Sequence, residues 1–325
     1  MPPSPAARRR WIFLLRLLLG LLLLAWLVRS IGIRPILDAF ALFRASPGLI
    51  AAALALTFLA LLAGVVRWHA LLRLLGLSTP FRTTFRAFFA GQFFNAFFFG
   101  ACGGDLLRAV MAVREHPDRK TEAVGSVILD RGIGLLVTLL FGCLALLPGL
   151  RTRLADPVWH KISWLMAAFA ILNASAAIAT ISDTAWSLAV RLAPNPAKNA
   201  LTRLRTSTAY FRRHPRTILL PTLLSLANLL LLAAACHALS VALSLAIPWR
   251  EWLPIFPVIT VLSAIPLTPG SLGVREALFV TLLAPLGVPS APALALSLLT
   301  YLTATLWSLF GGALLIIPSS PTITR

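Results

Sequence analysis

The chain has 325 residues, of which 59% are hydrophobic and 12% are charged, and its mean hydropathy is +0.89. Soluble domains carry about 25% charged residues, so the composition excludes a soluble protein and indicates a polytopic α-helical membrane protein. The net charge of +19 does not indicate nucleic-acid binding, because the arginines lie at the ends of apolar segments, where membrane topology explains them.

Two predicted spans precede the first unusual segment. Residues 11–28 form an apolar run after three arginines, and no small-residue cleavage site follows, so we expect a retained membrane span rather than a signal peptide. The second span covers residues 47–66 and is closed by Arg67 and Trp68, which are residue types that favour the membrane interface.

The segment Phe85–Arg108 has the composition of neither a plain span nor a loop. It holds eight of the chain's 19 phenylalanines, yet the polar residues Gln92 and Asn95 interrupt it. We predict a helix that enters the bilayer, breaks at residues 100–104 and restarts as a short helix with Asp105 at its start. Irregular backbone at this depth requires protein or a water-filled cavity to satisfy its polar groups, so the segment predicts a polar cavity within a helical bundle.

The remaining predicted spans are residues 123–147, 162–181, 217–247 and 291–317. The run 217–247 is longer than a bilayer core of roughly 30 Å requires, so it is expected to tilt or to protrude around Pro221. Prolines and glycines interrupt residues 252–288, which we interpret as a second broken hairpin. The predicted fold is therefore an all-α membrane bundle with about six full spans and two broken re-entrant hairpins.

The distribution of lysine and arginine predicts the orientation. One side would carry the N-terminus and the loops 67–86, 105–122 and 183–216, which together hold more than twice as many lysines and arginines as the opposite loops. By the positive-inside rule this side is cytoplasmic. Both termini and both ends of the Phe-rich hairpin then lie in the cytoplasm, and the loop 183–216 lies on the membrane surface against anionic lipid headgroups.

The first group of candidate functional residues follows the Gly103-Gly104 pair. Asp105 and Arg108 are three residues apart and so share one face of a helix. Two interpretations stay open: a capped helix with a surface ion pair, or a pair that lines the polar cavity.

The second group is Asp130-Arg131, which lies roughly 12 Å inside the span 123–147. Charged side chains at this depth nearly always pair, and they mark a pathway or a site. Adjacent residues do not face each other on a helix, so each requires a partner from another segment. The alternative is a purely structural buried network.

The third group of candidate functional residues lies at the C-terminal end of the segment 266–276. Two prolines and two glycines in this segment are expected to break the helix. Either Thr268 or Ser271 is expected to cap the new helix, whose first turn carries Arg275 and Glu276. The N-terminus of such a half-helix attracts anions such as phosphate, and breaks at matching places in two halves of a chain indicate a transporter's binding site.

Other reactive residue types do not form a recognisable site. The three cysteines lie in apolar stretches without a CxxC pair, and the five histidines lack the spacing of metal ligands. His237 is expected to pack in the core, with a proton relay as the alternative. We therefore expect neither a cofactor nor a metal.

Three motifs, taken in order, resemble the lysylphosphatidylglycerol synthase transmembrane region, also called the flippase-like domain family. They are the GGDxxR motif that ends at Arg108, the step Asp130-Arg131-Gly132, and the block Thr268–Glu276, which reads TPGSLGVRE. The resemblance covers about residues 10–317. The chain departs from the family pattern at Ala101-Cys102, where proline and further glycine are usual, and at Asp130, where glutamate is usual.

The resemblance implies a lipid flippase or lipid-transport protein of the bacterial inner membrane. The expected organisation is a basic cytoplasmic N-terminus (1–10), the flippase-like transmembrane domain (11–317) and a short cytoplasmic tail (318–325). The cytosolic aminoacyltransferase domain of the two-domain synthases is expected to be absent, so the chain should not synthesise lysylphosphatidylglycerol. Hopanoids and glycolipids are candidate lipids, since some stand-alone relatives accompany those pathways.

On this hypothesis an anionic, isoprenoid or glycolipid headgroup binds in one intramembrane cavity where the two hairpins meet, with the Phe-rich wall accepting the lipid tails. The expected binding residues are three arginines, three acids that orient them, and two polar residues: Arg108, Arg131, Arg275, Asp105, Asp130, Glu276, Asn95 and Ser271.

Two other functions stay open. The chain could be a non-catalytic partner that docks a lipid-biosynthesis enzyme through the loop 183–216. It could also be a membrane-embedded lipid-modifying transferase or hydrolase with Asp105 or Glu276 as base. An enzyme would need a nucleophile or metal site, and the sequence motifs predict neither.

Overall fold

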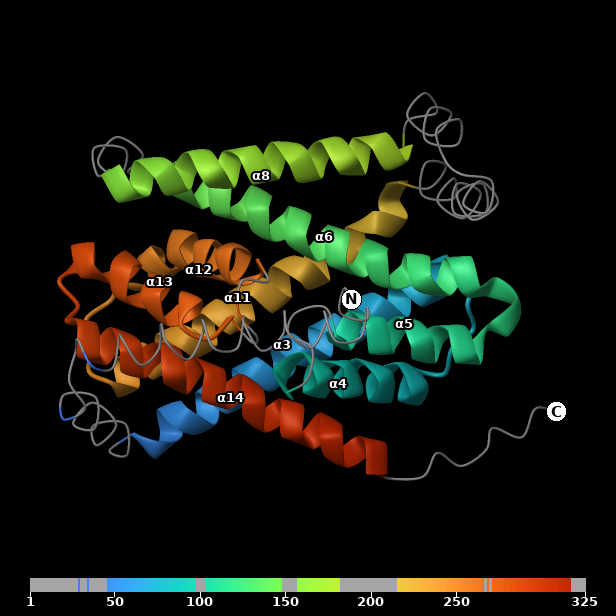
Figure 1. The fold of residues 1–325 in the computed structure, drawn as a ribbon, viewed down its shortest axis with the longest axis horizontal. Helices are drawn as coiled ribbons and strands as arrows, with labels where there is room; N and C mark the ends of the chain where they lie inside the picture. The colour runs from blue at the N-terminus through green and yellow to red at the C-terminus, as the bar shows by residue number, and fades with distance from the viewer. Residues whose placement is uncertain are drawn as a thin grey trace, which may run out of the picture.

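The computed structural model describes residues 46–97, 103–147, 157–181, 215–265, 268 and 271–316, together with Arg29 and Arg34. Within these ranges every regular element is a helix, so the predicted all-α class is confirmed (Figure 1). The predicted first span 11–28 lies outside them, as does nearly all of the loop 182–216. The longer helices are α3 (Pro47–Leu74), α4 (Phe81–Phe97), α5 (Gly103–Glu115), α6 (Lys120–Leu146), α8 (Pro157–Ile181), α11 (Leu219–Ala242), α12 (Trp249–Ser263), α13 (Val274–Leu283) and α14 (Ser290–Ile316).

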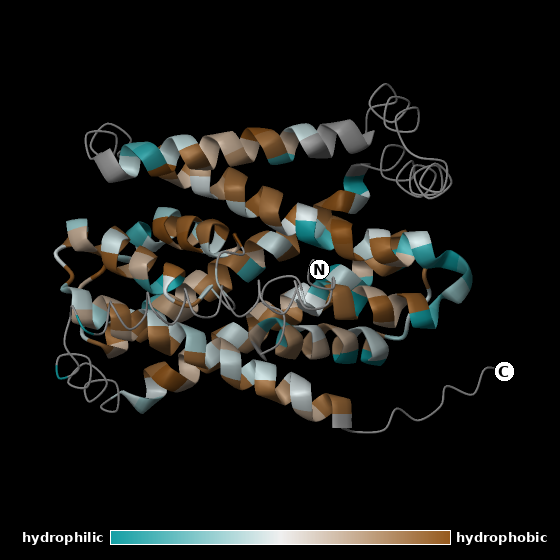
Figure 2. Ribbon diagram, viewed as in Figure 1, coloured by the Kyte–Doolittle hydropathy of each residue, from teal (hydrophilic) through white to brown (hydrophobic). Residues whose placement is uncertain are grey.

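Four helical segments among the described residues are long and apolar enough to cross a membrane. They are Pro47–Leu74, Pro117–Leu146, Arg216–Ala242 and Ser290–Leu315. At about 1.5 Å per residue each exceeds the roughly 30 Å of a hydrocarbon core. Figure 2 shows their apolar residues along the length of the bundle, with hydrophilic residues gathered where α5 leads into α6. The helical membrane protein predicted from the composition is thus confirmed.

Helix α3 differs from its predicted extent. The sequence predicts a span that closes at Arg67, whereas the helix continues for another two turns to Leu74. The extension holds because Trp68, Leu71 and Leu72 are fully buried and continue the core-facing side of the helix. Arg67 therefore lies inside a long helix rather than at its interfacial end.

Helices α4 and α5 form an antiparallel hairpin. At the closed end the backbone N–H of Gly104 donates to the Asn95 side-chain oxygen at 2.7 Å, and at the open end Thr79 bonds to His116 at 2.8 Å. The helices cross so closely that a Cβ atom on Gly104 would lie 2.0 Å from the carbonyl oxygen of Gly91. The sequence predicts a break at residues 100–104 with Asp105 at the start of the new helix, but helix α5 already begins at Gly103, so that part of the prediction is wrong. Residues 100–102 lie outside the described residues.

The open end of this hairpin lies beside the end of α3 and the start of α6. The Arg119 guanidinium, just before α6, donates to the carbonyl oxygens of Leu75 and Gly76 at 2.8 Å each. The chain therefore enters and leaves the α4–α5 hairpin at the same end of the bundle.

The phenylalanines of α4 pack against other helices. Phe89 stacks on Phe85 with 4.6 Å between ring centroids and meets Phe310 of α14 edge-on at 5.5 Å. Phe58 of α3 and Trp307 of α14 extend this aromatic cluster, with 4.6 Å between their centroids. These rings join α3, α4 and α14, with Phe89 fully buried and Phe310 39% exposed. That the Phe-rich segment accepts lipid tails stays a prediction.

In the second predicted broken hairpin, α12 ends at Ser263 and α13 begins at Val274, and residues 266, 267, 269 and 270 between them lie outside the described residues. These two helices contact each other, and α13 packs on α14. They lie at the end of the bundle away from α4 and α5 (Figure 1). Their core residues include the fully buried Trp252 and Phe279. Helix α12 runs through Pro254 and Pro257 without ending.

Helix α11 crosses the centre of the bundle and packs along α3. It has 24 residues, and the chain turns at Ser244, whose φ is +56°. The predicted run 217–247 therefore needs no protrusion around Pro221, which is buried in the first turn of α11. Residues 243–248 form the connection to α12 instead.

Candidate functional site

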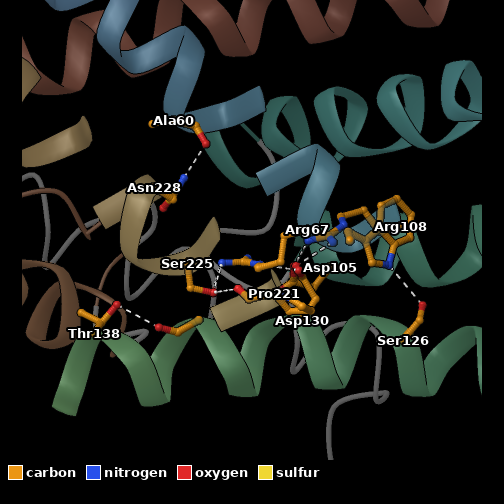
Figure 3. Close-up of polar contacts among 12 residues, drawn as sticks. Ala60, Arg67, Asp105, Arg108, Ser126, Asp130, Thr138, Pro221, Ser225 and Asn228 are labelled. Atoms are coloured by element: carbon orange, nitrogen blue, oxygen red, sulfur yellow. Dashed lines mark hydrogen bonds and ion pairs between the residues drawn. The ribbon is translucent and has the colours of Figure 1, made fainter. Parts of the chain in front are cut away.

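The carboxylate of Asp130 lies at the centre of a buried charge cluster (Figure 3). Asp130 is on α6 and is 1% exposed. Its Oδ1 accepts a hydrogen bond from Arg67 Nε of α3 at 2.7 Å, and its Oδ2 accepts one from Arg108 Nη2 of α5 at 2.8 Å. The carboxylate thus joins three helices. Charge-assisted bonds of this length are among the strongest that side chains make.

Arg108 is 7% exposed and has an aromatic cover. Its guanidinium carbon lies 4.3 Å from the ring centroid of Trp68 and 4.8 Å from that of Phe88. Cation–π contacts of this kind partly replace lost hydration. The Trp68 ring is held by a hydrogen bond from its Nε1 to Ser126 Oγ at 3.1 Å. Side chains therefore fill the centre of the cluster, where the sequence predicts a cavity.

Arg67 is the principal residue that the sequence analysis missed. Besides Asp130, it bonds through Nη1 to Ser225 Oγ of α11 at 3.0 Å. Ser225 in turn donates to the carbonyl oxygen of Pro221 at 2.8 Å. The signal that could have found Arg67 is the apolar periodicity at Leu71 and Leu72, which places the arginine well inside a helix rather than at its end.

Asp105 and Arg131 form the exposed edge of the cluster. Asp105 Oδ1 lies 3.4 Å from Arg108 Nη1, and its Oδ2 lies 3.6 Å from Arg131 Nε. The side chain of Arg131 is 53% exposed, and that of Asp105 is 22% exposed. The next residue, Gly132, has nothing within 4 Å of where a Cβ would be, so the surface beside Arg131 is open. The prediction that Asp130 and Arg131 each require a partner from another segment is confirmed.

The formal charge of the cluster is positive. Three arginines (67, 108 and 131) face two aspartates (105 and 130), so one positive charge is not neutralised within the cluster. In an apolar bundle, uncompensated charge has a high energetic cost. An anion bound at the exposed edge would lower that cost.

Arg275 and Glu276 form a second polar group, between α13 and α14. Glu276 is fully buried, and its Oε1 accepts hydrogen bonds from Arg275 Nη2 at 2.5 Å and from Ser297 Oγ at 3.4 Å. The Arg275 guanidinium lies over the Tyr301 ring at 4.4 Å. One base and one acid make this group formally neutral.

The cap of α13 differs from the prediction. The N-cap is Gly273, whose φ is +81°, and its backbone N–H donates to Glu276 Oε2 at 2.6 Å. Only glycine adopts this conformation at little cost. Ser271, expected as a cap and binding residue, donates instead to the carbonyl oxygen of Ser263, and Thr268 bonds to that of Leu272.

The eight predicted binding residues do not form a single cluster. Asp105, Arg108, Asp130 and Arg131 come together, and Arg67 joins them. Arg275 and Glu276 bond with α14 instead and lie toward the other end of the bundle (Figure 1). Asn95 and Ser271 make internal contacts that stabilise the two hairpins. The predicted meeting of both hairpins at one hollow is therefore wrong for the described residues.

A comparison with known protein families identifies the same family that the three sequence motifs resemble. The sequence model of the lysylphosphatidylglycerol synthase TM region matches residues 13–311, which is nearly the whole chain. The chain belongs to this family. A search of curated proteins found no significant match. Membership in the lysylphosphatidylglycerol synthase TM region family indicates a membrane protein of lipid-related processes.

Only two of the three family motifs contribute residues to the buried cluster. The GGDxxR motif and the Asp130-Arg131-Gly132 step supply four residues of the buried cluster, whereas the TPGSLGVRE block supplies the neutral pair on α13. Within the described residues, no group of three or more histidine, cysteine or acidic side chains could hold a metal ion. His237 meets Trp249 edge-on at 5.6 Å, a contact that fits core packing.

Proposed function

We propose that this chain is a lipid flippase or lipid-transport protein of the bacterial inner membrane and that it binds an anionic lipid headgroup at the Arg67–Arg108–Arg131 cluster. The observation that carries the proposal is the excess of one positive charge in a cluster whose centre, at Asp130 and Arg108, is buried among apolar helices and whose edge, at Asp105 and Arg131, is exposed. Intramembrane ionisable residues are rare, and they mark substrate pathways more often than simple packing.

The geometry suggests where a headgroup would bind. Asp130 holds Arg67 and Arg108 by short bonds, whereas Arg131 is half exposed and only loosely paired. A phosphate group could therefore reach Arg131 first and then Arg108 behind it. The first turn of α5, with the positive end of its helix dipole, lies at the same edge and would add to the attraction.

We also propose that the chain moves lipid without modifying it. Both residues that could act as a general base, Asp105 and Glu276, are already ion-paired with arginines. The alternative of a membrane-embedded transferase receives no support from this arrangement.

The open end of the α4–α5 hairpin supports the proposed orientation. The helix ends and connections on that side carry four exposed basic side chains, Arg73, Arg82, Arg114 and Lys120, against two exposed acids, Glu115 and Asp118. By the positive-inside rule this end would face the cytoplasm, where the basic residues would contact anionic lipid headgroups. Docking of a lipid-biosynthesis enzyme at this end is a further possible use of the same charges.

A transport assay with a matched charge control tests the proposal. The purified protein is reconstituted into vesicles with a fluorescent anionic phospholipid in one leaflet, and the rate of its appearance in the other leaflet is measured. Arg131→Gln is expected to slow transfer, while Arg250→Gln should not, because Arg250 is 83% exposed and lies on α12 outside the cluster. Equal transfer by protein-free vesicles would refute the proposed transport.

A further inference from the structure

The formal charge of the buried cluster carries information on the class of lipid. Asp130 is shared by Arg67 and Arg108, and Asp105 lies between Arg108 and Arg131. Every carboxylate in the cluster is thus already engaged by guanidinium groups, and the sum over the five side chains is one positive charge.

The two carboxylates differ in how firmly they are held. The Asp130 contacts are 2.7 and 2.8 Å long and fully buried, whereas the Asp105 contacts are 3.4 and 3.6 Å long and partly exposed. A contact of 3.6 Å is too long for a hydrogen bond. In addition, Arg108 Nε is buried without a hydrogen-bond partner among the described residues. A ligand oxygen that enters beside Asp105 therefore finds unused donor capacity on the half-exposed Arg131.

We infer that the cluster selects lipids whose headgroup carries one net negative charge on a phosphodiester, and that it discriminates against headgroups with an added ammonium group. This inference rests on the proposed function, since it specifies the substrate of the same site. A monoanion brings the sum of charges to zero. A cationic headgroup raises it, and a phosphomonoester dianion reverses it. Each imbalance is costly because the surroundings are apolar.

Within the cluster, neither aspartate has a carboxylate to spare for a headgroup ammonium, which strengthens the discrimination. A headgroup ammonium needs a carboxylate partner when it leaves water. The next acid along α6, Glu122, has one carboxylate oxygen paired with Arg119 and the other buried without a partner among the described residues. It lies eight residues before Asp130, roughly 12 Å away along the helix, and so does not reach the cluster. An aminoacylated phospholipid would therefore leave its amino group without a partner among the described residues of the cluster.

A lipid competition experiment tests this inference. The full chain, purified in mild detergent, is mixed with equal amounts of four lipids with matched acyl chains, and native mass spectrometry measures which are retained. The lipids are phosphatidylglycerol, phosphatidylethanolamine, phosphatidic acid and lysylphosphatidylglycerol. We expect phosphatidylglycerol to be retained about tenfold over the lysylated form, a ratio that corresponds to about 1.4 kcal/mol.

Two variants change the charge of the cluster in opposite directions. Both substitutions are at partly exposed positions, so we expect the variants to fold. Asp105→Asn adds one positive charge and should move the preference toward phosphatidic acid. Arg131→Gln removes one and should raise retention of phosphatidylethanolamine relative to phosphatidylglycerol. Arg250→Gln removes the same charge outside the cluster and should leave the ranking unchanged.

The outcomes separate this inference from the proposed function. If lipids are retained but lysylphosphatidylglycerol ranks first, or if both cluster variants leave the ranking unchanged, charge selection is wrong while lipid binding stands. If no lipid is retained, the proposed function itself fails, and charge selection fails with it. A final arm adds soluble glycerophosphoglycerol at the lipid concentration. It should not displace phosphatidylglycerol, and displacement would mean that a free phosphodiester is the ligand.

Discussion

Replacing Asp130 with asparagine should destabilise the protein more than any other single change in the buried cluster. The substitution keeps the shape of the side chain but removes its charge, which leaves Arg67 and Arg108 without their shared counter-ion. Asp130 is 1% exposed, so water cannot replace the lost interaction. Removal of one partner from a buried ion pair costs about 3–5 kcal/mol, mainly because the remaining charge stays desolvated.

The matched control is Asp105→Asn, which is the same chemical change at the edge of the same cluster. The Asp105 contacts are longer and its side chain is 22% exposed, so we expect a loss of about 0–1 kcal/mol, as for exposed ion pairs. The assay is reversible unfolding of the purified protein in mixed detergent micelles, followed by circular dichroism. The difference between the two free energies of unfolding is the quantity of interest.

A double variant tests the physical reason directly. The Asp130→Asn substitution leaves the charges of Arg67 and Arg108 unpaired, and Arg67→Gln removes one of them. The double variant should therefore lose less free energy of unfolding than the two single variants lose in sum. If Asp130→Asn is as mild as Asp105→Asn, or if the two losses add, the carboxylate does not join the three helices as the distances indicate.

The remaining predictions concern packing and positioning. Gly104→Ala should destabilise the α4–α5 hairpin, because the new Cβ would lie 2.0 Å from the Gly91 carbonyl oxygen, and proteolysis within the hairpin should become faster, whereas Gly132→Ala should be neutral because nothing lies within 4 Å. Glu276→Gln should cost about 1.5–3 kcal/mol in the same unfolding assay, since the carboxylate accepts bonds from the Gly273 backbone and from a buried guanidinium. Ser225→Ala should slow lipid transfer while leaving expression unchanged, because Arg67 loses its contact with α11 at 3.0 Å. A transfer rate equal to that of the unmodified protein would show that Ser225 does not position the arginine.

The sequence by itself determined the features that depend on local pattern. The low fraction of charged residues determined the membrane class, and the prolines and glycines of the segment 266–273 determined that the helix is interrupted before α13. The position of Asp130-Arg131 within an apolar run determined that both side chains need distant partners, because adjacent residues on a helix point in different directions.

Only the tertiary structure decided which partners these are. Arg67 is 63 residues from Asp130, and their contact depends on how α3 packs against α6, which no local pattern encodes. The same holds for the Arg275–Glu276 pair. Its motif resembles the first one in sequence, yet the packing of α13 on α14 holds it apart from the buried cluster. Local composition specifies where helices start, end and carry charge, whereas the separation or meeting of those charges depends on contacts between helices that are distant along the chain.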